Sequence, residues 1–467
     1  MNRISQRMMK AWAGLGARYL PFADAASDDV PLERLLRLSL FQVSAGMTLV
    51  LLVGTLNRVM IVELGVPASL VAVMLAMPLV AAPFRALIGF KSDTHRSELG
   101  WKRVPYFYKG TMVQFGGLAI MPFALLVLAR QGHAADVPPI VGQIAAGLAF
   151  LLVGAGLNTT QTVGLALATD LTPPEKQPNV VGLMYVALLA GSIVSALIFG
   201  ALLYHFTPGR LVQVIQGAGV ATILLNGIAV WKQEARGSAR PRQATVPDPS
   251  FQQSWASFMS GDRALARLVA VGVGTLAFSM QDVMLEPYGG QVLGLAVSRT
   301  TLLTAAMAAG GLIGFSLASY VLSRGFDAFR MASLGATVGV PAFIMIIMAA
   351  PLLSPVLFGL GTFFIGFGAG LFGHGTLTAT MNSAPKEQRG LALGAWGAVQ
   401  ATAAGIGVAL GGVIRDALSS LEPGSVLTPY LSVYVVEVIL LIAAIVTMNS
   451  LVRTPAGAAA SNTAQIR

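Results

Sequence analysis

Long apolar runs, separated by short polar segments, recur along the whole chain. Six runs lie in the first half, at roughly 36–60, 67–90, 107–129, 139–169, 179–204 and 209–231. Six more follow in the second half, at roughly 265–287, 298–323, 330–350, 354–382, 390–415 and 428–452. Because about 20 apolar residues suffice for a helix to cross a bilayer, the pattern predicts an all-α polytopic membrane protein with 12 transmembrane helices.

Polar segments divide these runs into domains. We expect an N-terminal arm at 1–35, a six-helix bundle at 36–231, a linker at 232–263, a second six-helix bundle at 264–452 and a tail at 453–467. Trp12, Tyr19 and Phe22 lie among the basic residues of the arm. The arm therefore either lies along the membrane surface or forms a mobile tail.

The composition agrees with a lipid environment. The 467 residues have a mean hydropathy of +0.73, and only 11% of them are charged, against about 25% in soluble domains. The absence of cysteine excludes disulfides, thiolate metal sites and cysteine nucleophiles. A net charge of +10 would suggest a nucleic-acid partner for a soluble protein. Here the basic residues lie in short loops between apolar runs, so no nucleic acid is expected.

The basic residues also predict the orientation of the chain. All but six of the 30 lysines and arginines fall at the termini or in loops on the same side as the termini. The six others, within spans or on the opposite side, are Arg58, Arg85, Arg130, Arg210, Arg299 and Arg415. By the positive-inside rule, both termini are expected to be cytoplasmic.

The two halves resemble each other in sequence. Three stretches recur in the same order, with 54–56 matching 274–276, 87–90 matching 312–315, and 168–177 matching 379–388. Two parallel six-helix repeats joined by a basic cytoplasmic linker are the plan of major facilitator transporters. The loop after the second run supports this plan, because Gly89 and Asp93, followed by Lys102 and Arg103, resemble the loop signature of that superfamily.

This loop has two interpretations. Its glycine allows close helix approach, and its aspartate can cap a helix end or hold a basic partner across a cytoplasmic gate. The loop is longer than the superfamily norm, so an ordinary positive-inside loop is the alternative to a gate.

Charges inside the membrane are informative, because each costs about 3 kcal/mol or more at the bilayer centre. Aligned by the repeat, Arg58 of the first helix faces the position of Asp282 in the seventh, and Glu286 follows one turn later. An Arg58–Asp282 pair would close a central cavity or bind a polar substrate group; the alternative is that both are hydrated at the periplasmic interface. Arg85 either snorkels to the cytoplasmic surface or lines the cavity, and Glu437 lies inside the last span without an evident partner.

His374 is the histidine that lies well inside a predicted span. Its neighbours include five glycines, namely Gly366, Gly368, Gly370, Gly373 and Gly375. These glycines either expose a flat surface for a planar macrocycle, whose metal the imidazole would bind axially, or allow close helix packing around a hydrogen-bonded histidine. We prefer the packing interpretation, and we expect no other metal site.

Four stretches, 56–65, 83–90, 100–106 and 281–290, resemble the PucC/LhaA family, the bacteriochlorophyll delivery branch of the major facilitator superfamily in phototrophic bacteria. The resemblance runs from about Trp12 to Arg453. It implies a membrane assembly factor for light-harvesting antennas in the inner (intracytoplasmic photosynthetic) membrane. The implied partners are the antenna α/β polypeptides, with LH1 favoured over LH2, together with bacteriochlorophyll, its synthase and membrane lipid.

Two functions remain open. The first is an assembly factor that delivers bacteriochlorophyll to the antenna polypeptides or holds them while pigment binds. The second is a secondary transporter of a tetrapyrrole or another amphiphile, with Asp282 and Glu286 as proton-coupling carboxylates. An enzyme is not expected, because the sequence contains no P-loop, nucleophile elbow or H-E-x-x-H motif.

Overall fold

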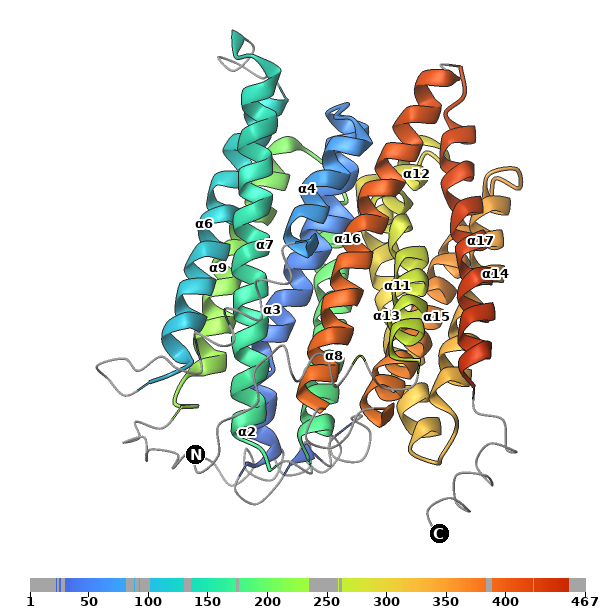
Figure 1. Ribbon diagram of the computed structural model, residues 1–467. Helices are drawn as coiled ribbons and strands as arrows, with labels where there is room; N and C mark the ends of the chain where they lie inside the picture. Colours follow the sequence, from blue (N-terminus) through green and yellow to red (C-terminus); the bar gives the residue numbers. More distant parts are fainter. Residues whose placement is uncertain are drawn as a thin grey trace, which may run out of the picture.

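The computed structural model describes residues 22, 25–26, 30–80, 88, 92, 101–129, 136–173, 176–234, 259, 263–383, 389–422 and 424–452. All regular structure in these ranges is helical, which confirms the all-α class. Within the described residues, eleven helices are long and apolar enough to cross a membrane, and they run side by side in one bundle (Figure 1). The predicted second span is described only as far as Val80. The chain is a multi-pass membrane protein.

The first half begins with an irregular span. Its elements are α2 (Leu32–Leu38), α3 (Leu40–Leu49), η2 (Val50–Leu56), η3 (Val59–Glu63), α4 (Ala68–Val80), α6 (Val104–Leu128), α7 (Pro139–Asp170), α8 (Gln177–Leu202) and α9 (Pro208–Val230). The first four form one span, Leu32–Glu63, in which η2 and η3 are π-helical. Such wide turns are rare and frequently mark functional sites.

The second half also begins with an irregular span. Its elements are α11 (Ala264–Ser279), η5 (Met280–Val283), α12 (Leu285–Gln291), α13 (Val297–Leu322), α14 (Ala328–Ala349), α15 (Pro355–Ser383), α16 (Arg389–Leu421) and α17 (Leu427–Leu451). The first three form one span, Ala264–Gln291, which is interrupted by the 3-10 turn η5. The opening helix of each half is therefore distorted.

Local sequence signals explain where several helices start. Pro139 and Pro208 are the first residues of α7 and α9, a position where the missing N–H has no intrahelical partner to lose. The side chains of Thr207 and Asp327 cap α9 and α14 by accepting the backbone N–H three residues further on.

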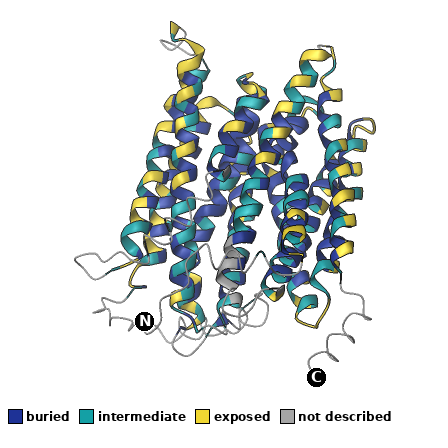
Figure 2. Ribbon diagram, in the orientation of Figure 1, coloured by how far each residue is buried: buried dark blue, intermediate teal, exposed yellow. Residues whose placement is uncertain are grey.

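Each end of the bundle is named by the helices that begin or end there. The terminal face is the end where α2 begins and α17 ends, and the far face is the end where η3 ends and α17 begins (lower and upper ends in Figure 1). The halves meet mainly where α4 packs against α16 and where α8 packs against α13. Outward faces carry large exposed apolar side chains such as Phe123, Ile144 and Val446 (yellow positions in Figure 2), as expected of a surface in contact with lipid.

Glycines bring α13 and α15 into backbone contact. A Cβ added at Gly366 of α15 would collide with the carbonyl oxygen of Met307 in α13, and one added at Gly310 of α13 would collide with that of Phe363 in α15. Small residues at such positions are how helices approach closely in membranes, where van der Waals packing drives their association.

We therefore expect Gly366→Val to lower the free energy of unfolding by about 1–3 kcal/mol, the usual range for overpacking. The measurement is the melting temperature of the purified protein in mild detergent. Gly359→Val, on the same helix, is the matched control, because a Cβ at Gly359 meets nothing within 4 Å. Equal melting temperatures for the two variants would contradict the backbone contact.

Candidate functional site

A cavity of about 400 Å³ lies between the two halves. Residues from both halves line it, among them Val53 of η2, Leu189 of α8, Asp282 of η5, Phe315 of α13, Gly373 of α15 and Gln400 of α16. The cavity thus occupies the place where a transporter of this plan holds its substrate.

The wall of the cavity is mostly apolar, with polar side chains at η5 and at a few other positions such as Gln400 of α16. Gln281, Asp282 and Thr304 line it near the η5 break, whereas Phe315 and Gly373 line it further along α13 and α15. Because α13 runs from the far face to the terminal face, Thr304 lies on the far-face side of Phe315. The Gln281 amide donates to the Asp282 carboxylate. The cavity therefore has a mixed, mostly apolar lining with a carboxylate at η5.

Arg58 lies near Asp282 in the fold but does not pair with it. The guanidinium, 5% exposed, donates to Glu63 Oε1 at 2.6 Å and to the backbone oxygen of Leu295 at 3.0 Å. The predicted Arg58–Asp282 ion pair was therefore wrong. Two physical reasons explain this: the π-helical end of the first span brings Glu63 back to Arg58, and the Asp282 side chain lines the cavity instead.

The two halves are nevertheless joined by hydrogen bonds near Asp282 and at the far face. Asn57 donates to the backbone oxygen of Asp282 at 3.3 Å, so a backbone contact stands where the ion pair was expected. Near the same face, Asp416 of α16 accepts the backbone N–H of Ser69 at 2.6 Å and so binds the first turn of α4. With the bond from Arg58 to Leu295, these contacts close the far face by hydrogen bonds between the halves.

Two further buried carboxyl groups lie around η5. Glu286 is 1% exposed and accepts a hydrogen bond from Thr304 at 2.9 Å, so it contacts the cavity wall rather than the cavity itself. Glu437 of α17 is fully buried and close enough to Asp282 to interact electrostatically. No group of three or more His, Cys, Asp or Glu side chains within the described ranges is placed to hold a metal ion.

His374 lies beside the cavity, behind Phe315. The two rings meet edge to face with centroids 4.3 Å apart, and Nδ1 of His374 is buried. Four of the neighbouring glycines pack on backbone atoms of α13 or α14, as the packing interpretation requires; they are Gly366, Gly368, Gly370 and Gly375. Only Gly373 among the five opens onto unfilled space, and it lines the cavity.

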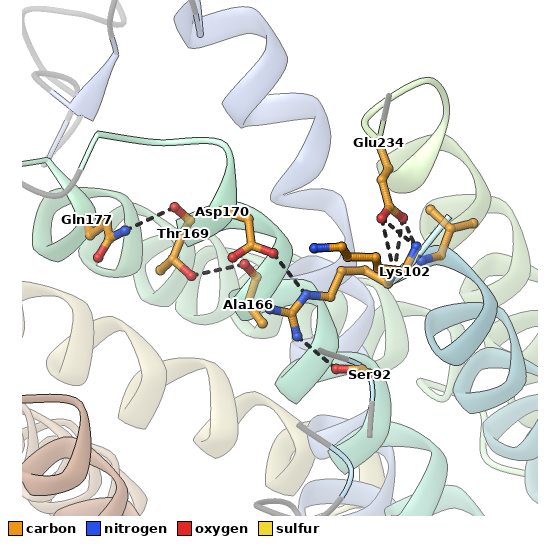
Figure 3. A network of polar contacts seen from close by, with 9 residues as sticks. Ser92, Lys102, Ala166, Thr169, Asp170, Gln177 and Glu234 are labelled. Carbon is orange, nitrogen blue, oxygen red and sulfur yellow. Dashed lines mark hydrogen bonds and ion pairs between the residues drawn. The ribbon is translucent and has the colours of Figure 1, made fainter. Parts of the chain in front are cut away.

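The basic residues at the start of α6 bind acidic groups of their own half (Figure 3). Arg103 donates to Asp170 at 3.0 Å and to Ser92 at 2.8 Å. The Glu234 carboxylate accepts the backbone N–H of Lys102 at 2.7 Å and so caps α6. Sequence reasoning missed Asp170 and Glu234; the available signal was a single acidic residue at the end of a span, facing a basic helix start.

The gate interpretation of this loop remains a prediction. Gly89 and Asp93 lie outside the described residues, as does Arg85. The contacts described above join Lys102 and Arg103 to Asp170 at the end of α7, to Ser92 and to Glu234 at the start of the linker.

Arg58→Gln should weaken the closure of the far face, because Gln cannot make both charged hydrogen bonds of the guanidinium. We expect the free energy of unfolding to fall by about 1–3 kcal/mol, the range for hydrogen bonds to charged groups. Arg299→Gln is the control, since Arg299 is an exposed arginine at the start of α13. The measurement is the melting temperature of each variant in detergent. A melting temperature of Arg58→Gln equal to that of the wild type would mean that the hydrogen bonds of the Arg58 guanidinium do not stabilise the protein.

Comparison with known proteins places the chain in a family. The family model described as PUCC protein matches residues 55–456. The chain is 62% identical to the Protein PucC of Rhodovulum sulfidophilum over 420 residues, covering 90% of this chain and 92% of that protein. It is 55% identical to the Protein PucC of Cereibacter sphaeroides over 463 residues, covering 97% of this chain and 98% of that protein.

A solved structure with the same fold is that of a bacterial homologue of the human lysosomal transporter Spinster. The TM-score is 0.66 at 15% identity, and the match covers 89% of this chain and 95% of that one. At this identity the likeness establishes the fold alone, which is that of the major facilitator transporters. With a matching family model and relatives of this identity, the chain belongs to the PUCC protein family.

Proposed function

We propose that this protein is a non-enzymatic assembly factor for bacterial light-harvesting antenna complexes, which presents bacteriochlorophyll to the antenna α/β polypeptides. One observation carries the proposal: the cavity between the halves is lined mostly by apolar side chains and glycines, with Asp282 at η5 and a few other polar groups such as Gln400 in its wall. The family resemblance supplies the kind of cargo, an amphiphilic tetrapyrrole.

The shape and lining of the cavity support an amphiphilic cargo. About 400 Å³ falls within the roughly 300–1,000 Å³ of small-molecule sites, which are mostly apolar with a few placed polar groups. A sugar or an ion would need hydrogen-bonding groups along the whole wall. Here the wall holds some polar groups, among them Ser192, Asp282 and Gln400, but apolar side chains and glycines make up most of it, so a hydrophilic solute is disfavoured.

His374 and Gly373 are the residues that could meet a pigment ring. Gly373 is the open glycine of the cavity wall, and His374 follows it in the chain. The four packed glycines leave no broad flat surface, so the fit is to the edge of a macrocycle at Gly373. Axial binding of the pigment metal by His374 is part of the proposal and is tested separately below.

A secondary transporter of an amphiphile is the alternative function. The 3-10 break η5, with Asp282 in the cavity wall and Glu286 and Glu437 behind it, favours it. Discontinuous helices near the centre of the membrane are where transporters bind substrates and coupling ions. Transport would need the halves to rock about this site, whereas presentation of pigment would not.

The location follows from the same proposal. The terminal face would lie in the cytoplasm and the bundle in the intracytoplasmic photosynthetic membrane, with antenna polypeptides, lipid and the pigment synthase as partners. LH1 is the client favoured by the resemblance, and LH2 is the other candidate. The identity of the α/β polypeptides that co-purify would decide between them.

Purification in mild detergent from a phototrophic host is the direct test. We expect tetrapyrrole absorbance and antenna polypeptides in the purified fraction, measured by spectroscopy and by mass spectrometry of peptides. A colourless protein without antenna polypeptides, which catalyses proton-linked solute uptake in liposomes, would establish the transporter alternative instead.

Gly373→Leu should reduce pigment retention, because the new side chain projects into the cavity. Gly359→Leu adds the same side chain to an open position of the same helix outside the cavity. The ratio of pigment absorbance to protein, measured after purification, should fall in the first variant and stay at the wild-type value in the second. An equal ratio in both variants would show that pigment binds elsewhere.

His374→Ala should leave the fold intact and lower the same ratio if the imidazole binds the pigment metal. The position of the pigment absorption band provides a second readout, since loss of an axial ligand alters it. Unchanged pigment content and band position would remove His374 from the site.

A further inference from the structure

Phe22 of the N-terminal arm packs into the first half of the bundle. Its ring lies directly on Gly182 of α8, where an added Cβ would come within 2.6 Å of the Phe22 ring carbon Cε1. A glycine is therefore needed at 182 for the ring to fit. The backbone of Phe22 has φ +63°, a left-handed conformation that is rare for bulky residues. Its packing must outweigh this strain.

The same ring also contacts the second half. Its centroid lies 6.0 Å from that of Phe315 in α13 and 6.4 Å from that of His374 in α15. The ring of Tyr185, one turn after Gly182 in α8, lies 6.0 Å from Phe315. Phe22 thus sits in an aromatic seat, formed by Gly182, Phe315 and His374, that belongs to both halves.

Neighbouring arm residues hold Phe22 in this position. Lys176, just before α8, donates from its ammonium group to the backbone oxygen of Ala26. Ala25 and Val30 are buried in a hydrophobic cluster with Leu183 of α8. All these contacts are with the first half, so the arm is anchored there and reaches the second half through Phe22.

The aromatic seat lies between the cavity and the terminal face. Gly182 is five residues into α8, which places it about 8 Å from the end of that helix at a rise of 1.5 Å per residue. Phe315 contacts Phe22 and also lines the cavity. The Phe22 ring therefore touches the cavity wall, through Phe315, from the side of the terminal face.

We propose that Phe22 is a plug carried by the N-terminal arm, which closes the central cavity at the terminal face and ties the two halves together there. Release of the ring from the aromatic seat opens the cavity to its cargo. This role applies whether the cavity serves pigment presentation or transport, because it concerns only access to the cavity.

Cavity access can be measured directly, because the chain contains no cysteine. Ala369→Cys places one thiol in the cavity wall, and its rate of reaction with a water-soluble maleimide reports access in the full chain reconstituted in nanodiscs. We expect a several-fold faster reaction when Phe22→Ala is added. Gly182→Ala should give the same increase, because its methyl group would collide with the Phe22 ring and displace it.

Two controls keep the test specific. Tyr108→Ala removes an aromatic ring that is 62% exposed on α6 and should leave the reaction rate unchanged. The melting temperature of each variant shows that the bundle is folded. In the double variant Phe22→Cys with Phe315→Cys, a short bis-maleimide should join the two thiols and so confirm the position of the arm.

The proposal has two ways to fail. An absent cross-link would show that the arm does not occupy the seat. A cross-link combined with unchanged reaction rates in both Phe22→Ala and Gly182→Ala would show that the arm is a structural anchor and not a plug. Because the readout is thiol reactivity, neither result depends on whether pigment binds.

Discussion

Backbone N–H and C=O groups cannot be left open to lipid, so a spanning helix can break only where protein or a cavity receives the freed groups. The turn η5 meets this requirement through a hydrogen bond from the first half, and α16 packs closely on it. Asn57 of the first span donates to the backbone oxygen of Asp282. Gly411 brings α16 so close to the oxygen of Met280 that an added Cβ would lie 2.7 Å from it. The break is thus held between both halves.

The polarity of the cavity follows from this break. The change of helix type turns the Asp282 side chain into the cavity wall, while Glu286, four residues later, is buried against Thr304. In a continuous helix these carboxyl groups would lie on one face, because residues four apart are neighbours. Because of the break, Asp282 lines the cavity, whereas Glu286 accepts a hydrogen bond from Thr304 of the cavity wall.

Hydrophobic runs were sufficient to predict the helices, because spans in lipid must be long and apolar. The pairing of side chains was harder to predict from the sequence, because the repeat aligns positions along the bundle but does not indicate the local type of helix. Arg58 was expected opposite Asp282, whereas the π-helical end of its own span gives it Glu63 as a partner. Glu437 was recognised as buried, and only the fold could show Asp282 as its neighbour.

The glycines around His374 show the same limit. Sequence spacing cannot distinguish a glycine that meets another helix from one that faces a cavity, since both lack a side chain. Gly375 packs on the backbone of α14, and Gly373, two residues earlier, lines the cavity. The sequence did not indicate where Phe22 packs, because an aromatic residue in a basic arm can lie on a membrane surface as well as pack against the protein.

The two faces of the bundle differ in the contacts that join the halves. At the far face, Arg58 and Asp416 reach across with charged hydrogen bonds, which are stronger than neutral ones. Near the terminal face, Arg103 binds Asp170 within the first half, and the arm reaches the second half through aromatic contacts of Phe22. Aromatic contacts are non-polar and leave no buried charge unpaired when they separate. The described contacts of the two faces thus differ in kind, with charged hydrogen bonds at the far face and aromatic contacts near the terminal face.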